Sequence, residues 1–278
     1  MGSAPSGAGR RLSWLPLLRE LRRRRSVILG YHGVAESDRR LDLSRLQVAP
    51  SLFRRQLELL AQAGFRFMTM RDATDELTGA APRPGIAVVT FDDGLRNNHT
   101  TAAPILAELG IPATVYVACD FIAGHNPWIA AGGGGEMLTE DEIKALARAS
   151  WEIGAHTLSH ADLASLDYDG CLAEIDGSRR LLEQITATTV DAFAYPFGRY
   201  GPAAIAAARD AGMRTAVTTG SGCWRPFELT RAMISAGDPG VVVALKLVDR
   251  YEPLLRLAPL RAARSASRTA RARIQGAA

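Results

Sequence analysis

The feature that most constrains the fold is a repeated alternation of short apolar runs with longer helical patterns. The runs are bounded by turn residues, and segments with apolar residues at helical spacing lie between them. This order is typical of parallel strands joined by crossover helices. We expect strands at residues 26–31, 86–91, 113–118, 151–155, 192–195, 215–218 and 229–234, and helices at 51–63, 101–109, 139–149, 168–184 and 202–211.

Local signals support the ends of these helices. Three of the expected helices stop just before a glycine, at Gly64, Gly110 and Gly212, as helix C-termini often do. Thr139 and Glu142 form the capping-box pattern, which predicts a helix start there. A length of 278 residues suits one large domain, because an α/β barrel of this size needs no second one.

Charge is distributed unevenly along the chain. Residues 1–30 contain seven Arg and one Glu, and residues 246–278 contain eight Lys or Arg and two acids, so each end has a net charge of +6. The whole chain has +4, which leaves −8 for the segment between the ends. An acidic body argues against a nucleic-acid-binding face, because phosphate binding needs a basic patch. We expect a basic arm at 1–25, a domain at 26–245, and a basic helix with a disordered tail at 246–278.

The arm has the pattern of a short basic amphipathic helix, with Leu15, Leu18 and Leu21 at helical spacing between arginines. Two interpretations stay open, namely contact with an anionic membrane surface and a solvated arm. Arg19 and Glu20 interrupt the apolar segment, so we expect no signal peptide. The expected location is the cytoplasm, at the inner face of a membrane if the arm binds lipid.

The first motif with chemical content is Asp92-Asp93-Gly94, at the end of the expected strand 86–91. Two adjacent acids where an apolar strand ends are costly unless a metal or a hydrogen-bond network partners them. A simple Asp-Asp-Gly turn explains this segment alone equally well.

The second motif places His156 and His160 just after the expected strand 151–155. Two imidazoles separated by three residues can converge on one ion, and with one carboxylate they form an open three-ligand site. Only five histidines occur in the chain, so two in one pentapeptide at a strand end favour a metal site.

The third motif, residues 193–198, contains Pro196 and Phe197. Since Pro196 has no N–H, Phe197 supplies the first backbone donor beyond it. This signal is weak alone, because proline turns next to aromatic residues are common.

Taken in this order, the motifs resemble those of the polysaccharide deacetylase family (NodB homology), which includes chitin, chitooligosaccharide, exopolysaccharide and peptidoglycan deacetylases. The resemblance covers about residues 26–238 and implies a distorted (β/α) barrel with a groove at the strand C-termini. It also implies that Asp92 is the catalytic base and that a divalent metal, with zinc as the first candidate, is held by three residues. These three are Asp93, His156 and His160.

The implied chemistry suits these residue types. A zinc-class ion polarises an amide or ester carbonyl and lowers the pKa of bound water, so that Asp92 can take a proton. The backbone N–H of Phe197 is the family-matched donor to the oxyanion.

Two departures from the family pattern need other residues. Many members use a late histidine as general acid, but no histidine follows His160, and His32 after the first expected strand resembles the acid of exopolysaccharide-type members. A core histidine is the alternative, and His99 and His125 are weaker candidates for the acid. Ala194 stands where many members have a base-positioning arginine, and Arg231 could supply that guanidinium from a later strand.

The sequence therefore favours a hydrolase that removes N-acetyl groups from a polysaccharide, oligosaccharide or glycolipid amino sugar, acting as a monomer. An O-acetyl esterase on the same scaffold is the first alternative. A catalytically silent, glycan-binding protein at the membrane periphery is the second. The long glycine-containing connection at 121–136 is either a lid over the groove or an insertion.

Overall fold

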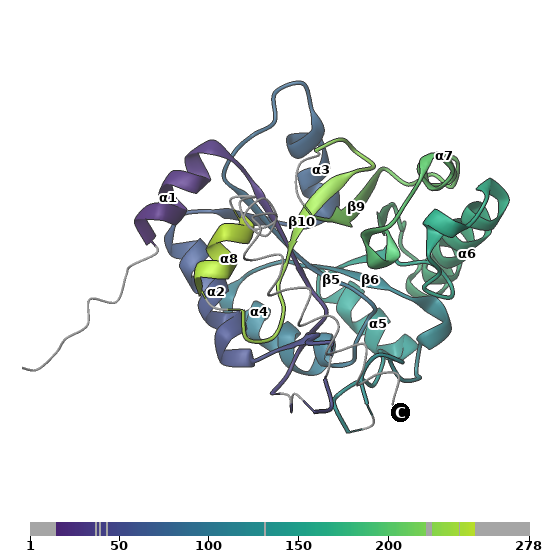
Figure 1. The fold of residues 1–278 in the computed structure, drawn as a ribbon, viewed down its shortest axis with the longest axis horizontal. Coiled ribbons are helices and arrows are strands. Elements are labelled where there is room, and N and C mark those ends of the chain that lie inside the picture. Colours follow the sequence, from purple (N-terminus) through teal and green to yellow (C-terminus); the bar gives the residue numbers. More distant parts are fainter. Residues whose placement is uncertain are drawn as a thin grey trace, which may run out of the picture.

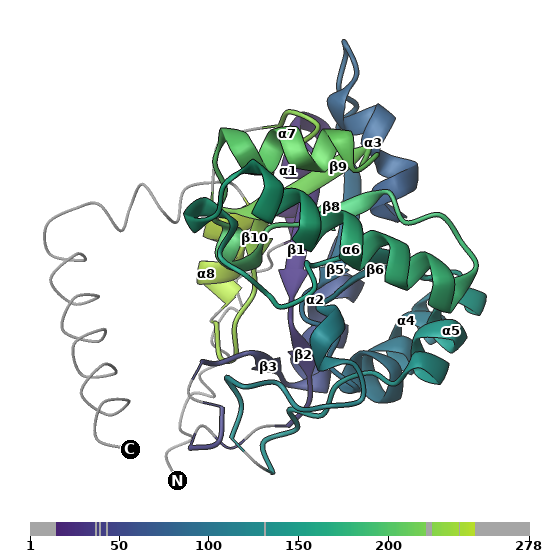
Figure 2. The ribbon, with the colours of Figure 1, turned by 90° about the vertical axis from the view of Figure 1, so that its right-hand side faces the viewer.

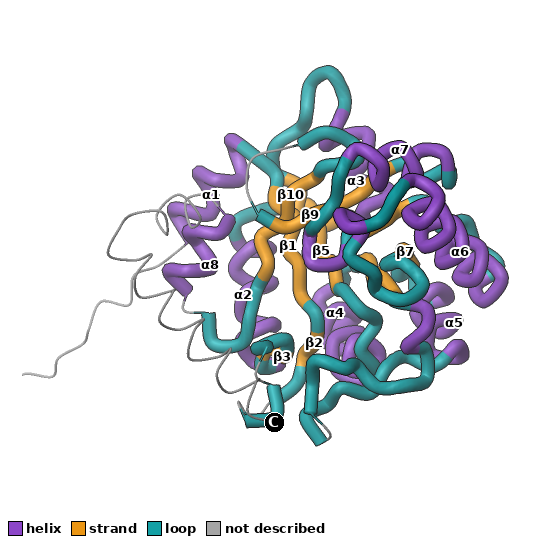
Figure 3. Tube along the Cα trace, turned by 45° about the vertical axis from the view of Figure 1, so that its right-hand side comes forward, coloured by secondary structure: helices purple, strands orange, loops and turns teal. Residues whose placement is uncertain are grey.

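Parallel strands form the centre of the molecule. The computed structural model describes residues 15–247 except 37, 39, 43, 131, 221–223 and 239. Figures 1 and 3 show the strands grouped at the centre with helices outside them. The seven expected strands are all present, as β1 (Val27–Tyr31), β5 (Ile86–Phe91), β6 (Thr114–Val117), β7 (Glu152–Ala155), β8 (Ala192–Ala194), β9 (Thr215–Thr219) and β10 (Leu229–Met233).

These seven strands close into a ring. Their order is β1-β10-β9-β8-β7-β6-β5, and β5 pairs back onto β1 with Val27 opposite Ala87 and Tyr31 opposite Phe91. Every pairing is parallel, so all the strand C-termini lie at one end. The expected distorted (β/α) barrel is confirmed.

The distortion lies at β5, whose second edge is shared by two strands. β4 (Arg66–Met68) pairs with the first half of that edge, from Ile86 to Val88. β6 pairs with the second half, beginning at Thr90. β4 was not expected from the sequence, and it widens the barrel wall at the end where the strands begin.

The expected helices surround the barrel, and their ends agree with the local signals. The capping box of Thr139 and Glu142 is formed in both directions, and Gly110 ends its helix in the left-handed conformation at φ 65°. A π-helical turn (Asn98–Ala102) precedes that helix and replaces the first part of the expected segment 101–109. The helices are α2 (Pro50–Gln62), α4 (Ala103–Leu109), α5 (Glu140–Arg148), α6 (Tyr168–Thr186) and α7 (Pro202–Asp210), and the short elements are β2 (Gly33–Val34), β3 (Gln47–Val48) and 3-10 turns at Cys119–Phe121, Leu163–Ser165 and Pro196–Gly198.

An unexpected helix, α3 (Met70–Thr78), closes the end of the barrel where the strands begin. In Figure 2 it lies at the top, opposite β2 and β3. Met70 is fully buried with the apolar residues of the barrel interior, and its N–H donates to Thr114 Oγ1 at 3.0 Å. The next N–H, of Arg71, donates to Glu152 Oε2 at 2.9 Å.

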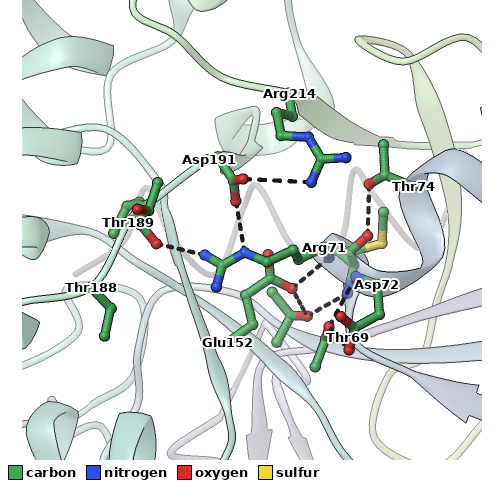
Figure 4. Close-up of polar contacts among 12 residues, drawn as sticks. Thr69, Arg71, Asp72, Thr74, Glu152, Thr188, Thr189, Asp191 and Arg214 are labelled. Atoms are coloured by element: carbon green, nitrogen blue, oxygen red, sulfur yellow. Dashed lines mark hydrogen bonds and ion pairs between the residues drawn. The ribbon is translucent and has the colours of Figure 1, made fainter.

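A polar network holds α3 in this position. The Arg71 side chain reaches from α3 to Asp191, just before β8, with Nε 3.1 Å from Oδ1 (Figure 4). Glu152, at the start of β7, also accepts from Thr114 Oγ1 at 2.7 Å. Burial raises the pKa of Glu152 to about 6, although the Arg71 N–H and the Thr114 hydroxyl oppose this shift. This end of the barrel is therefore closed, which leaves the end with the strand C-termini for the expected groove.

Part of the basic arm packs on the domain. α1 (Leu15–Arg24) lies against α2, and Leu18 and Leu21 are buried in the outer core. α8 (Gly240–Leu247) packs near β10, whereas residues 1–14 and the tail from 248 lie outside the described residues. No helix in the described part of the chain is long and apolar enough to cross a membrane.

Candidate active site

Three predicted metal ligands meet at the strand C-termini. Asp93 follows β5, and His156 and His160 follow β7. Nε2 of His156 lies 3.5 Å and Nε2 of His160 3.4 Å from Asp93 Oδ1, and one ligand atom from each residue lies within 4.8 Å of the others. All three side chains are buried. The group therefore offers two nitrogens and one oxygen to a single point, which is the donor set of an open zinc-class site.

The backbone at these ligands adopts a conformation that ordinary residues rarely take. Asp93 has φ 70°, Thr157 φ 67° and His160 φ 58°, all in the left-handed region. Such strain persists only where surrounding structure enforces it, and it gathers at functional sites. The turns after β5 and β7 therefore aim their side chains inward at a cost in backbone energy.

The hydrogen bonds around the ligands leave the right atoms available for a cation. His156 Nδ1 lies 2.7 Å from Ala194 O, so the ring donates there and turns its Nε2 lone pair toward Asp93. Asp93 Oδ2 accepts from Asn126 Nδ2 at 2.8 Å. Asp93 Oδ1 is buried and accepts no hydrogen bond from any described residue, an arrangement that costs free energy unless a cation lies there. The residues present fit a divalent ion.

The charges of the group also favour a cation. Burial raises the pKa of Asp93, but the ring nitrogens of His156 and His160 hold it well below its usual range. Burial lowers the pKa of His160, whereas for His156 the neighbouring carboxylates outweigh burial and raise it. A proton on His156 at acid pH would compete with a metal for Nε2.

Asp92 is fixed by the arginine that the sequence analysis assigned to it. Arg231 on β10 donates from Nη1 and Nη2 to the two Asp92 oxygens, each at 2.7 Å. Arg231 also donates from Nη1 to Thr90 Oγ1 at 3.0 Å and from Nε to Thr218 O at 3.3 Å, and its guanidinium lies over the Tyr116 ring. Arg231 is 2 % exposed and Asp92 4 %. Burial raises the pKa of Asp92, but the charge and hydrogen bonds of Arg231 together with the charge of His156 outweigh burial, and the pKa lies below its usual value.

The other two predicted residues lie at the same end of the barrel. His32 directly follows β1 and is half-buried, and its positive charge would lower the pKa of both Asp92 and Asp93. Phe197 has φ 59° and a side chain that is 53 % exposed, and its ring centroid is 4.7 Å from that of His160. The two weaker histidines are placed differently, since His99 faces Glu142 of α5 and His125 contacts the carbonyl of its neighbour Asn126.

Two residues of the site were missed by sequence reasoning. Asn126 and Trp128 belong to the long connection before α5, and Trp128 has its ring centroid 4.4 Å from that of His160. The only sequence signal was an Asn-Pro-Trp segment close to several glycines, and nothing in that pattern points to Asp93 or His160.

Comparisons with known proteins identify the family of this chain. A protein-family model described as polysaccharide deacetylase matches residues 79–216. The Bacillus subtilis protein YxkH, named as a candidate polysaccharide deacetylase, is 28% identical over 218 residues, which are 77% of this chain and 72% of YxkH. The chain belongs to the polysaccharide deacetylase family. The matched segment contains Asp92 and all three members of the metal-binding group. It contains neither His32 nor Arg231, so the roles assigned to these two residues depend on the fold of this chain.

Solved structures of similar proteins have the same fold. The Streptococcus pyogenes deacetylase PplD, solved in complex with acetate, is 25% identical to this chain, with a TM-score of 0.65. The match covers 75% of this chain and 92% of PplD. The Bacillus cereus polysaccharide deacetylase BC0361 is also 25% identical with a TM-score of 0.65, covering 80% of this chain and 68% of BC0361.

Proposed function

We propose that this protein is a metal-dependent hydrolase that removes N-acetyl groups from an amino sugar in a polysaccharide, oligosaccharide or glycolipid. One observation carries the proposal. The buried Asp93 Oδ1 faces two histidine nitrogens without a hydrogen bond from the described residues, and the adjacent Asp92 is held as an ionised carboxylate by Arg231. A metal-binding group beside a fixed base is the arrangement that hydrolysis of an acetyl group needs.

Asp93, His156 and His160 would hold the ion, for which zinc is the first candidate because the donors are two imidazoles and one carboxylate. When bound, such an ion supplies Lewis-acid chemistry, which polarises a carbonyl oxygen and makes water more acidic. The hydrogen bond from His156 Nδ1 to Ala194 O keeps that ring in the tautomer whose Nε2 can bind the ion.

Asp92 would act as the base. Its pKa lies below the usual value, so the carboxylate is ionised and can accept a proton from water at neutral pH. The two bonds from Arg231 fix both carboxylate oxygens, which limits the geometry from which a proton can be taken.

His32 would act as the general acid, and the Phe197 N–H as a donor to the oxyanion. The leaving amine must be protonated, and an unperturbed imidazole has its pKa close to neutrality. The position of His32 directly after β1, and the effect of its charge on Asp92 and Asp93, support this role. The contact between the rings of Phe197 and His160 supports the role of Phe197.

An O-acetyl esterase remains the second candidate, because Asp92 and the metal-binding group would treat an ester carbonyl in the same way. The two candidates differ at the leaving group, since an alkoxide needs less help from an acid than an amine does. A catalytically silent protein is disfavoured by the presence of the base, its arginine and all three ligands in one site.

The experiment is acetate release from a panel of N-acetylated and O-acetylated sugars, with the chelator-treated chain assayed before and after zinc is added. We expect release from the N-acetylated sugars only with metal, and none from Asp92→Asn, which keeps the metal ligands but cannot accept a proton. Release from O-acetylated sugars alone would establish the esterase. Full activity of Asp92→Asn would overturn the assignment of the base.

A further inference from the structure

The connection from residue 122 to residue 138, called here the 122–138 loop, is bonded to the segment that follows the two acids. Leu138 N–H donates to Gly94 O at 2.9 Å, and Arg96 N–H donates to Glu136 O at 2.7 Å. The two sides of the loop are also joined, because Asn126 N–H donates to Gly135 O at 2.7 Å. The described part of the loop is thus anchored at the turn that contains Asp93.

Asn126 lies in this loop and has no exposed surface. Its Nδ2 donates to Asp93 Oδ2 at 2.8 Å, and its Oδ1 accepts from Trp128 N at 2.9 Å. The bond from Asn126 fixes the Asp93 side chain, because it occupies Oδ2. Asp93 Oδ1 is then the oxygen that faces the two histidines.

Trp128 packs against the ring of His160. The Trp128 ring centroid lies 4.4 Å from the His160 ring, and Phe197 contacts the same imidazole at 4.7 Å. His160 Nδ1 is buried and has no hydrogen-bond partner within the described chain, unlike His156 Nδ1, which has Ala194 O. The orientation of the His160 ring therefore depends on aromatic packing in place of the usual hydrogen bond.

We propose that Asn126 and Trp128 are positioning residues for Asp93 and His160, and that the described part of the 122–138 loop is a fixed part of the metal centre. This inference rests on the proposed function only in requiring that the Asp-His-His group binds a divalent ion. The Asn126 side chain joins the two effects, because one end of its amide holds Asp93 and the other holds the Trp128 backbone. The loop could open as a lid only by breaking these contacts, which would loosen two of the three metal ligands, Asp93 and His160.

The test is a zinc titration of the chelator-treated full chain, measured as a dissociation constant, for Asn126→Ala, Trp128→Ala and Trp128→Phe. We expect zinc binding to weaken roughly 10- to 100-fold in Asn126→Ala, the usual range for removing a partner of a metal ligand. Trp128→Ala should weaken it also, whereas Trp128→Phe keeps a ring against His160 and should recover most of the affinity. Excess zinc should restore kcat in Asn126→Ala, because the base is untouched.

Asn98→Ala is the matched control. Asn98 is equally buried at the same end of the barrel, but its Nδ2 donates to His32 O at 2.8 Å and to no metal ligand. Its zinc affinity should equal that of the wild type. Melting curves of the metal-free variants identify any that fail to fold.

Zinc affinities within twofold of wild type in folded Asn126→Ala and Trp128→Ala would overturn this inference and leave the proposed function intact. An equal loss of affinity in Asn98→Ala would also overturn it, because the effect would then be general. A wild-type chain that binds no divalent ion would overturn the metal site itself, and the inference with it.

Discussion

Replacing Arg231 by Met should destabilise the metal-free chain by about 3–5 kcal/mol, the usual cost of breaking a buried ion pair by removing one partner. Met fills much of the space of the arginine stem, but it leaves the Asp92 carboxylate buried without its cation. Arg231 is 2 % exposed and Asp92 4 %, and two bonds of 2.7 Å join them. An exposed ion pair would contribute at most about 1 kcal/mol, so the two cases are easily distinguished.

The double variant Asp92→Asn with Arg231→Met separates the cost of an unpaired buried charge from the cost of lost packing. It removes both charges, so no unpaired ion is left inside the barrel. We expect it to be more stable than Arg231→Met alone, because the single variant contains the penalty of an uncompensated buried charge. Arg180→Met is the exposed control, since Arg180 pairs with Asp176 at 2.7 Å but its side chain is 68% exposed. Its effect should be about 0–1 kcal/mol.

The assay is urea unfolding followed by circular dichroism, with chelator present so that metal binding does not contribute to stability. A loss of stability in Arg231→Met no larger than that in Arg180→Met would contradict this prediction. A double variant no more stable than the single one would also contradict it, since the cost would then come from lost packing and not from charge.

Three further predictions concern the acid, the closed end and the basic arm. His32→Gln should lower the rate on an unactivated amide roughly a hundredfold or more and the rate on an aryl acetate much less; equal losses would indicate a structural role. The pKa of Glu152 is about 6 in the folded chain and about 4.5 in the unfolded chain. Protonation of Glu152 therefore stabilises the fold at low pH, and this contribution is lost as pH rises between these values. Glu152→Gln should therefore gain about 2 kcal/mol relative to wild type between pH 4 and pH 7 in urea unfolding, and a constant difference across that range would contradict the assignment. The chain should sediment with anionic vesicles and be released from them at high salt, because Leu18 and Leu21 of α1 are buried while Arg19, Arg23 and Arg24 are exposed; equal binding to neutral and anionic vesicles, or binding to neither, would contradict this.

The strands of the barrel could be predicted from sequence because each is an apolar run between turn signals. β4 and α3 could not be found in this way. β4 has only three residues, two half-buried and one exposed, and it exists because it pairs with the first half of β5. α3 buries Met70, Ala73 and Leu77 at helical spacing, but polar residues surround them, and its place under the barrel depends on tertiary bonds to Thr114 and Glu152.

The residues of the site could also be predicted only in part from the sequence. Asp93, His156 and His160 follow strands whose C-termini must meet in a parallel barrel, so their proximity follows from pattern and topology together. Arg231 lies 139 positions from Asp92 and was found only because the family's usual arginine is replaced by Ala194. Asn126 and Trp128 had no such guide, because a loop conformation and not a periodic pattern brings them to the ligands.

The metal site is central to the proposed activity, and a zinc titration of the chelator-treated wild-type chain beside His156→Ala tests it. We expect about one zinc per wild-type chain, and loss of both zinc binding and acetate release in His156→Ala, because this residue supplies a ligand nitrogen whose orientation Ala194 O fixes. Full zinc occupancy and an unchanged rate of acetate release in His156→Ala would contradict the account.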